Sequence, residues 1–252
     1  MSALFDLDKL QHALETGDGA GVRVAVLDSG VDSELDDFKE GLTSYEIQMT
    51  GGAMDCVETK GVDELGHGTA CAWIIRSLAP KAELHSIKIL GGEARGTSAE
   101  LAQGIKWSID NGMDVVNISA GVRGPRSKDV LSAEADRALY EGVTIVAAAH
   151  NHGLAAYPAN LSSVLTVTYD NFKDTRQFRY RTKEQVELEA HGIYVETPKP
   201  GGGTRSYTGT SFACPHVTGF VAQLLSVYPD LQPFEIRALL YHLGRQQGDD
   251  AA

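Results

Sequence analysis

The chain of 252 residues is long enough for one large domain or two small ones, and 42% hydrophobic residues is ordinary for a protein with a buried core. A formal net charge of -12 disfavours nucleic acid as a partner, because phosphates require a basic face. The N-terminus lacks the basic and apolar regions of a signal peptide, and no apolar run approaches the length of a membrane span.

From residue 21 onward, short β-branched segments alternate with longer helical patterns. Strands are predicted at 21–28, 82–90, 113–119, 143–149 and 163–169, and helices at 67–80, 98–112, 129–142, 211–227 and 232–244. This alternation predicts right-handed βαβ crossovers and therefore a three-layer α/β fold, with helices on both faces of a mostly parallel sheet. Residues 171–208 break the alternation and are expected to form a β-rich flap or edge hairpins.

Short terminal segments flank a single predicted domain at 21–245, since no repeat or long linker divides the chain. Residues 1–20 form an extension in which three leucines share one face of an amphipathic helix: Leu7, Leu10 and Leu14. Packing against the domain is the simplest role for this helix. Residues 246–252 are expected to form a flexible tail.

The three cysteines are odd in number and unrelated in spacing: Cys56, Cys71 and Cys214. This pattern favours free thiols in a reducing compartment, so it predicts a cytoplasmic location. Two of them are expected to be buried packing residues, Cys71 one turn after His67 and Cys214 in the helix at 211–227. A thiol-reactive metal bound to Cys71 would disturb His67.

Four polar residues from distant parts of the chain fall at strand ends or helix starts. Asp28 ends the first predicted strand, Asn151 follows the strand at 143–149, and two others begin helices, His67 and Ser211. Because ligands of parallel α/β sheets bind beyond the carboxyl ends of the strands, one crevice can collect all four. Taken alone, each has a plainer interpretation as a turn, cap or loop residue.

The residue types match nucleophilic attack on a carbonyl. A serine hydroxyl becomes reactive when a neutral histidine takes its proton, and a buried aspartate fixes the histidine tautomer. An asparagine amide, and the unpaired N–H of Ser211 at a helix start, can donate to the oxyanion that forms. Pro215 is expected in the first helical turn, where its missing N–H costs nothing.

Four segments carry a family resemblance: VLDSGVD, GHGTACA, AAAHNHG and GTSFACPHVTG. In that order they resemble the signature blocks of the subtilisin-like serine peptidases, and the similarity covers most of 20–243. The resemblance implies a subtilisin-like fold, a catalytic triad of Asp28, His67 and Ser211, and Asn151 as oxyanion donor. It also implies two backbone edges that pair with an extended peptide or protein substrate, formed by Gly91, Gly92, Ser119, Ala120 and Gly121.

Two positions near the implied specificity pocket depart from the family pattern. His150 stands where relatives usually carry a glycine before the oxyanion asparagine, and Ala156 stands where they usually keep a glycine at the pocket floor. Both side chains narrow the pocket, and the imidazole adds a polar and potentially cationic wall. We therefore expect a small or acidic residue before the cleaved bond.

The sequence predicts no metal and no cofactor. It contains no zinc-binding spacing, and the glycines at 201–203 lack the lysine of a phosphate-binding loop. The chain from His67 to the strand at 82–90 has no insertion like the calcium loop of many secreted relatives, so no equivalent of that site is expected.

The leading hypothesis is a cytoplasmic serine endopeptidase that processes a specific peptide or protein. A peptide ligase or macrocyclase is the first alternative, because an amine can capture the same acyl-enzyme instead of water. Relatives that cyclise usually carry a capping insertion, which we do not find. A non-catalytic peptide-binding pseudoprotease is the second alternative, and the complete set of catalytic residue types disfavours it. The expected partner is an extended peptide or protein, with neither nucleic acid nor membrane, and the oligomeric state is left open.

Overall fold

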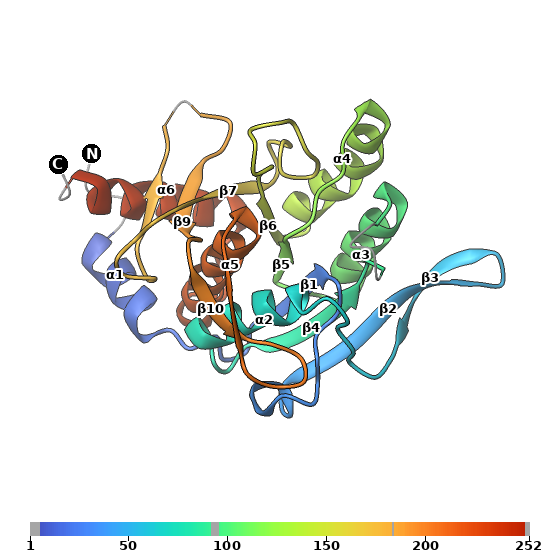
Figure 1. Cartoon of the computed structure of the whole chain (residues 1–252). Helices are drawn as coiled ribbons and strands as arrows, with labels where there is room; N and C mark the ends of the chain where they lie inside the picture. The colour runs from blue at the N-terminus through green and yellow to red at the C-terminus, as the bar shows by residue number, and fades with distance from the viewer. Residues whose placement is uncertain (1–5, 92–95, 183, 250–252) are drawn as a thin grey trace.

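A computed structural model describes residues 6–91, 96–182 and 184–249, with side chains as far as Arg245 (Figure 1). Gly92 and the outermost residues of both terminal segments lie outside the described residues. The strands of the main sheet are β1 (Arg23–Asp28), β2 (Leu42–Thr50), β3 (Ala53–Glu58), β4 (Glu83–Lys88), β5 (Val115–Ile118), β6 (Thr144–Ala148), β7 (Leu165–Asp170), β8 (Phe178–Tyr180) and β9 (Leu188–His191).

Within the described residues, this sheet has the strand order β3-β2-β4-β1-β5-β6-β7-β9-β8. All neighbouring strands from β2 to β9 run parallel, whereas the edge pairs β2–β3 and β8–β9 are antiparallel. A separate antiparallel pair joins β10 (Val195–Pro198) to β11 (Thr204–Tyr207). The parallel sheet is therefore confirmed, and the irregular segment at 171–208 supplies one sheet edge and a small hairpin.

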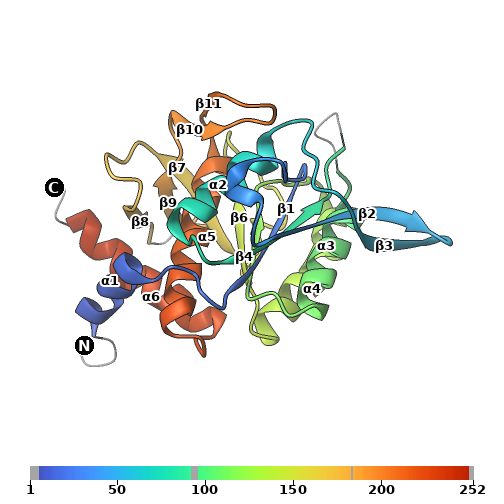
Figure 2. The same ribbon diagram turned by 90° about the horizontal axis from the view of Figure 1, so that it is seen from below.

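Helices cover both faces of the sheet: α1 (Leu7–Thr16), α2 (His67–Leu78), α3 (Ser98–Asp110), α4 (Pro125–Tyr140), α5 (Thr210–Val227) and α6 (Pro233–Asp249). Figures 1 and 2 show α3 and α4 on one side, with α2, α5, α1 and α6 on the other. Two large buried clusters match these layers. The three-layer α/β fold predicted from the sequence is confirmed.

The central strand β1 shows why its sequence forms a buried strand. Its last five residues are all buried, and successive side chains enter opposite cores. Val24 and Val26 join the cluster under α2 and α5, whereas Ala25 and Leu27 join the cluster under α3. A strand covered on both faces has no polar side, so its sequence is a continuous apolar run that ends at Asp28.

Helices α4 and α6 extend beyond their predicted bounds. Helix α4 begins at Pro125, four residues earlier than the predicted start at residue 129, because proline is favoured in a first helical turn. Helix α6 continues to Asp249, beyond the predicted end at residue 244 and into the segment expected to be a tail. Helix α1 does form, and its buried Leu10 and Leu14 pack in the core beside α5 and α6.

Helix α5 begins at Thr210, one residue before the predicted start, and Pro215 lies inside the helix beyond its first turn. Proline has no N–H to offer the carbonyl of Ser211 four residues earlier. That carbonyl instead accepts hydrogen bonds from Ser119 Oγ at 2.9 Å and Cys71 Sγ at 3.3 Å. Side chains from α2 and from the segment just after β5 therefore replace the missing helical bond, and they anchor α5 at Ser211.

The buried side chain of His216 in α5 predicts that the stability of the fold depends on pH. His216 is 4% exposed, and burial lowers its pKa to about 4, although the bond to the Phe212 carbonyl opposes this shift. Because the folded pKa lies below the unfolded value of 6.5, stability is lost as the pH falls from about 6.5 towards 4. The loss should reach about 3 kcal/mol for this group.

The measurement is urea unfolding at pH 7 and pH 4.5, using His216→Gln and the exposed-site control His12→Gln. We expect the His216 variant to lose less stability than the unmodified chain on acidification, since its side chain cannot protonate. The control should keep the original pH dependence. Equal losses in all three proteins would contradict a neutral, buried His216.

None of the helices in the described part of the chain is long and apolar enough to cross a bilayer.

Candidate active site

The fold brings the four predicted catalytic residues to one edge of the sheet. Asp28 is the last residue of β1, His67 the first of α2, and Ser211 the second of α5, while Asn151 follows β6. Ser119, just after β5, links the group because it lines a cavity with His67 and a neighbouring cavity with Asn151 and Ser211. The carboxyl ends of parallel strands thus meet two helix starts, as expected for this fold class.

Asp28 and His67 form a close pair. The carboxylate is fully buried, and its Oδ1 atom accepts from Nδ1 of His67 at 2.7 Å and from the Ser29 N–H at 2.7 Å. With Nδ1 carrying the proton, Nε2 of the neutral ring is left free to take one. Burial alone would lower the pKa of His67, but the charge and hydrogen bond of Asp28, with the charge of Asp63, raise it above 6.5.

Asp63 is not among the residues that the sequence predicts for the site. It is 4% exposed, and its two oxygens accept from the N–H groups of Leu65, Gly66 and Thr69. They also accept from two hydroxyls, Ser29 Oγ at 2.8 Å and Thr69 Oγ1 at 2.6 Å. Ser29 Oγ in turn accepts from the Gly68 N–H, so one carboxylate fixes the backbone on both sides of His67. An acid four residues before His67 is the only sequence signal for this role.

We expect Asp63→Asn to shift the acid limb of the pH–activity profile to lower pH. Removing the negative charge lowers the pKa of His67, and the base then stays neutral in more acidic solution. The amide also cannot accept at both former oxygens, so the melting temperature should fall. The measurement is kcat/KM from pH 5 to 9, with Asp129→Asn on the exposed surface of α4 as control. An unchanged acid limb would contradict the electrostatic role.

The Ser211 hydroxyl occupies a resting position. Its Oγ atom donates to the Ser119 carbonyl at 3.0 Å, and among the described residues no hydrogen bond joins it to His67. The thiol of Cys71 does not compete as a nucleophile, because burial raises its pKa well above 9 and Sγ donates to the Ser211 carbonyl. Rotation of the Ser211 side chain is needed before its proton can reach Nε2.

Asn151 is held with its amide nitrogen available. Its Oδ1 atom accepts from the Thr210 N–H at 2.9 Å and from Thr210 Oγ1 at 3.1 Å. Gly209 allows this approach because its φ is +151° and an added Cβ would lie 3.1 Å from Oδ1. With the oxygen committed to α5, the Nδ2 group remains to donate into the cavity that Asn151 lines.

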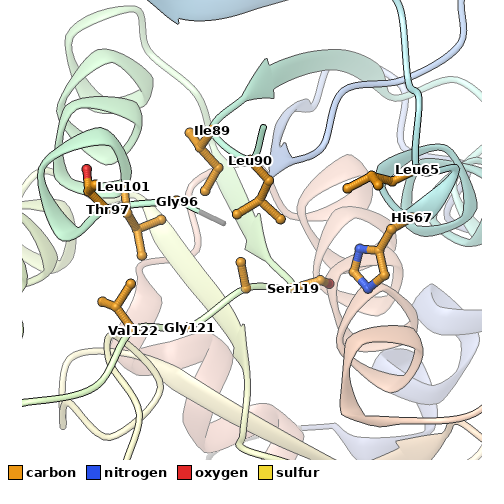
Figure 3. Close-up of a pocket in the computed structure, with 11 residues that line it drawn as sticks. Leu65, His67, Ile89, Leu90, Gly96, Thr97, Leu101, Ser119, Gly121 and Val122 are labelled. Carbon is orange, nitrogen blue, oxygen red and sulfur yellow. The ribbon is translucent and has the colours of Figure 1, made fainter. Parts of the chain in front are cut away.

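The larger of the two cavities has a volume of about 560 Å³ and a mainly apolar wall (Figure 3). The figure shows Leu65, Leu90, Leu101 and Val122 around it, with His67 at one side. The cavity is also lined by Ser119, Ala120 and Gly121, all three predicted to bind substrate. Gly91 is exposed at the end of a described segment, and Gly92 lies outside the described residues.

The smaller cavity has a volume of about 270 Å³ and is lined by His150, His152 and Ala156, together with Asn151 and Ser211. The Nδ1 atom of His150 accepts from the His152 N–H at 3.1 Å, so the neutral His150 ring carries its proton on Nε2. Ala156 is buried, and its methyl group would meet a Cβ built on Gly121 at 3.3 Å. His150 and Ala156 thus line the same cavity as Ser211.

One group of potential metal ligands occurs in the described part of the chain. Asp28, His67 and Cys71 each offer a ligand atom, and these atoms lie within 4.8 Å of one another. The hydrogen bond between Asp28 and His67 and the thiol bond from Cys71 to the Ser211 carbonyl already account for their proximity.

Comparison with known proteins bears on the identity of this site. The model of the subtilase family, Peptidase S8, matches residues 19–251. The chain belongs to the subtilase family. This subtilase is 33% identical over 248 residues to subtilisin DY of Bacillus licheniformis, covering 92% of the chain and 86% of the relative. It is also 33% identical to subtilisin BL of Lederbergia lenta, covering 87% of the chain and 81% of the relative.

Solved structures agree with this assignment. A cold-adapted subtilisin-like serine proteinase matches with a TM-score of 0.75 and 26% identity, over 90% of this subtilase and 83% of that chain. The S41 psychrophilic protease matches in fold with a TM-score of 0.78, over 92% of this subtilase and 88% of that chain. The protein is thus a subtilisin-like serine endopeptidase.

Proposed function

We propose that this subtilase hydrolyses peptide bonds with Asp28, His67 and Ser211 as its triad. The observation that carries the proposal is the 2.7 Å hydrogen bond from His67 Nδ1 to the buried Asp28, which leaves Nε2 as the base. After rotation, the Ser211 hydroxyl gives its proton to Nε2 as Oγ attacks the substrate carbonyl. Asn151 Nδ2 and the Ser211 N–H stabilise the oxyanion at the start of α5.

The remaining steps follow from the same groups. The imidazolium returns its proton to the leaving amine, which breaks the peptide bond and leaves an ester on Ser211. Water then attacks this ester, with His67 again taking the proton. Asp28 stabilises the imidazolium in both halves of the reaction without itself becoming protonated.

An extended substrate fits the backbone edge at Ser119, Ala120 and Gly121, as an added strand between the two cavities. Its N–H groups would compete for the Ser119 carbonyl that now accepts from Ser211 Oγ. Substrate binding would therefore release the hydroxyl towards His67. Apolar substrate side chains suit the larger cavity, because leucine, isoleucine and valine side chains line it.

The decisive test is a proteome-derived peptide library cleaved in H₂¹⁸O and read by mass spectrometry. Hydrolysis should place one ¹⁸O atom in each new C-terminal carboxyl group. Products joined to an amine without label would instead identify a peptide ligase. Absence of any conversion, together with no reaction with a fluorophosphonate probe, would identify a pseudoprotease.

A small or acidic residue is the expected preference before the cleaved bond. The 270 Å³ cavity is narrowed by His150 and Ala156, and His150 can donate from Nε2 to a substrate carboxylate. Peptides with glutamate or alanine at this position should exceed those with phenylalanine by about 10-fold or more in kcat/KM. His150→Gly should raise the rate on phenylalanine and lower it on glutamate. A preference of the unmodified enzyme for phenylalanine or leucine would overturn this specificity.

We also propose a cytoplasmic location and a processing role on a specific peptide or protein. Support for the location comes from Cys56, Cys71 and Cys214, which are free thiols in the described structure. Support for the processing role comes from the narrow, histidine-lined cavity, which suits few side chains. Cell fractionation tests the location, and a library showing cleavage at many unrelated sequences would contradict the processing role.

A further inference from the structure

A third cavity, of about 540 Å³, lies on another part of the molecule. It is enclosed by the C-terminal half of α2, the segment between β7 and β8, and the β9–β10 connection. Figure 2 shows α2 beside β10. The cavity shares no lining residue with the two cavities at Ser211 and His67. Its volume falls within the range typical of small-ligand sites.

Two histidines are among the polar residues that line it. His216 is almost fully buried, and its ring meets that of His191 edge-on with centroids 5.8 Å apart. Nδ1 of His216 pairs with the Phe212 carbonyl at 2.8 Å. Nδ1 of His191, by contrast, is buried without a hydrogen-bond partner in the described part of the chain. Buried polar atoms are normally paired, so this unpaired nitrogen is an uncommon feature of the region behind the cavity wall.

Aromatic and aliphatic side chains form the apolar part of the cavity wall. Trp73, Ile74 and Leu78 come from α2, and Val195 comes from β10. Tyr194 stands at the mouth, where its side chain is 79% exposed. Among the described residues it is the only non-glycine with a left-handed backbone, at φ 54°, and its N–H is held by Thr208 Oγ1. The fold thus keeps the backbone of Tyr194 in an unfavourable conformation, with its large aromatic ring beside the cavity.

Two opposite charges lie on the rim. Arg176, in the segment before β8, and Glu196, in β10, are both exposed and line the cavity. Within the described residues, neither side chain takes part in an ion pair. A guanidinium suits a carboxylate, and a carboxylate suits an ammonium group. A ligand with an apolar body, a carboxylate and an ammonium group would match both the apolar wall and the two charges on the rim.

We propose that this cavity binds a short peptide of two or three residues with free termini and an apolar side chain. Arg176 holds the ligand carboxylate, and Glu196 holds its ammonium group. Trp73 and Tyr194 enclose the apolar side chain. Binding here involves no covalent step and does not require that Ser211 be a nucleophile.

The test is isothermal titration of phenylalanyl-phenylalanine into the full chain carrying Ser211→Ala. We expect one binding site per chain, and at least about 10-fold weaker binding when either terminus of the dipeptide is blocked as amide or acetyl. Arg176→Ala should weaken the free dipeptide but not its C-terminal amide, and Glu196→Ala should weaken it but not its N-acetyl form. The matched surface controls Arg126→Ala and Glu15→Ala should bind like the parent protein.

Equal binding by all four charge variants would overturn the proposal. So would dipeptide binding that disappears when the unmodified enzyme is labelled with a fluorophosphonate, since the ligand would then occupy the catalytic cavities. A failure of labelling would count against Ser211 as nucleophile, while the charge variants would still decide the peptide site. Because Arg176 and Glu196 are exposed, both variants should retain the parent melting temperature, which is measured alongside.

Discussion

Ser211→Ala is expected to lower kcat by about 10⁶-fold while leaving the melting temperature nearly unchanged. The hydroxyl is the only atom group removed that can form the ester, and its resting hydrogen bond to the Ser119 carbonyl contributes little to stability. The neighbouring thiol of Cys71 cannot replace it, because the thiol is buried and its pKa is raised well above 9. The measurement is single-turnover cleavage of a peptide selected from the library.

Ser206→Ala provides the matched control, because Ser206 is exposed on β11 and lines neither catalytic cavity. This variant should retain full activity and full labelling by a fluorophosphonate, whereas Ser211→Ala should lose both. A residual rate within about 10-fold of the parent enzyme would mean that another group attacks the substrate carbonyl.

The secondary structure near the sheet centre could be predicted because burial on both faces leaves a strong pattern. β1, β4, β5, β6 and β7 all lie near their predicted positions, and at least half of the residues in each strand are buried. The hairpin β2–β3 is absent from the prediction. Its side chains are mostly half-buried or exposed, so the apolar signal is weak. The Gly51–Gly52 turn, with both φ values positive, was the available signal for two paired strands.

The candidate site likewise contains residues that the sequence could predict and contacts that it could not. Asp28, His67, Asn151 and Ser211 could be placed because residue type and position at strand ends point to one edge of the sheet. The role of Asp63 depends on backbone N–H groups that turn towards it only in the folded loop before α2. The direction of the Ser211 hydroxyl depends on the carbonyl of a residue 92 positions away. Neither contact leaves a pattern in the local sequence.

Pro215 shows how a local rule gives way to tertiary structure. The sequence places it at a helix start on the assumption that its missing N–H needs no replacement. In the fold, Ser119 and Cys71 provide donors to the Ser211 carbonyl, so the helix continues through the proline without leaving that carbonyl unpaired. The same contacts bring the nucleophile's backbone against β5 and α2. The side chains of Ser119 and Cys71 therefore fix Ser211 relative to the substrate-binding segment and to the helix that carries His67. Helix propensity, which considers only neighbouring residues, does not include such contacts.

Asp28→Asn is expected to lower kcat by about 10⁴-fold, with KM changed far less. An amide in place of the carboxylate can donate to Nδ1 of His67, which favours the tautomer with its proton on Nε2. The ring then cannot accept the Ser211 proton. Loss of the buried charge also removes the main interaction that raises the pKa of His67, so burial should lower this pKa. The acid limb of the remaining activity should therefore move to lower pH.

The profile of kcat against pH from 5 to 9 measures both effects, with the exposed Asp129→Asn variant as control. A tautomer defect depresses the rate at every pH, whereas loss of charge alone would only shift the acid limb. The two effects together distinguish Asp28 from Asp63. Substitution of Asp63 should shift the acid limb without lowering the rate at every pH, because Asp63 fixes the backbone around His67 and does not contact the ring. A loss smaller than about 10-fold for Asp28→Asn would show that the 2.7 Å pair does not set the histidine tautomer during catalysis.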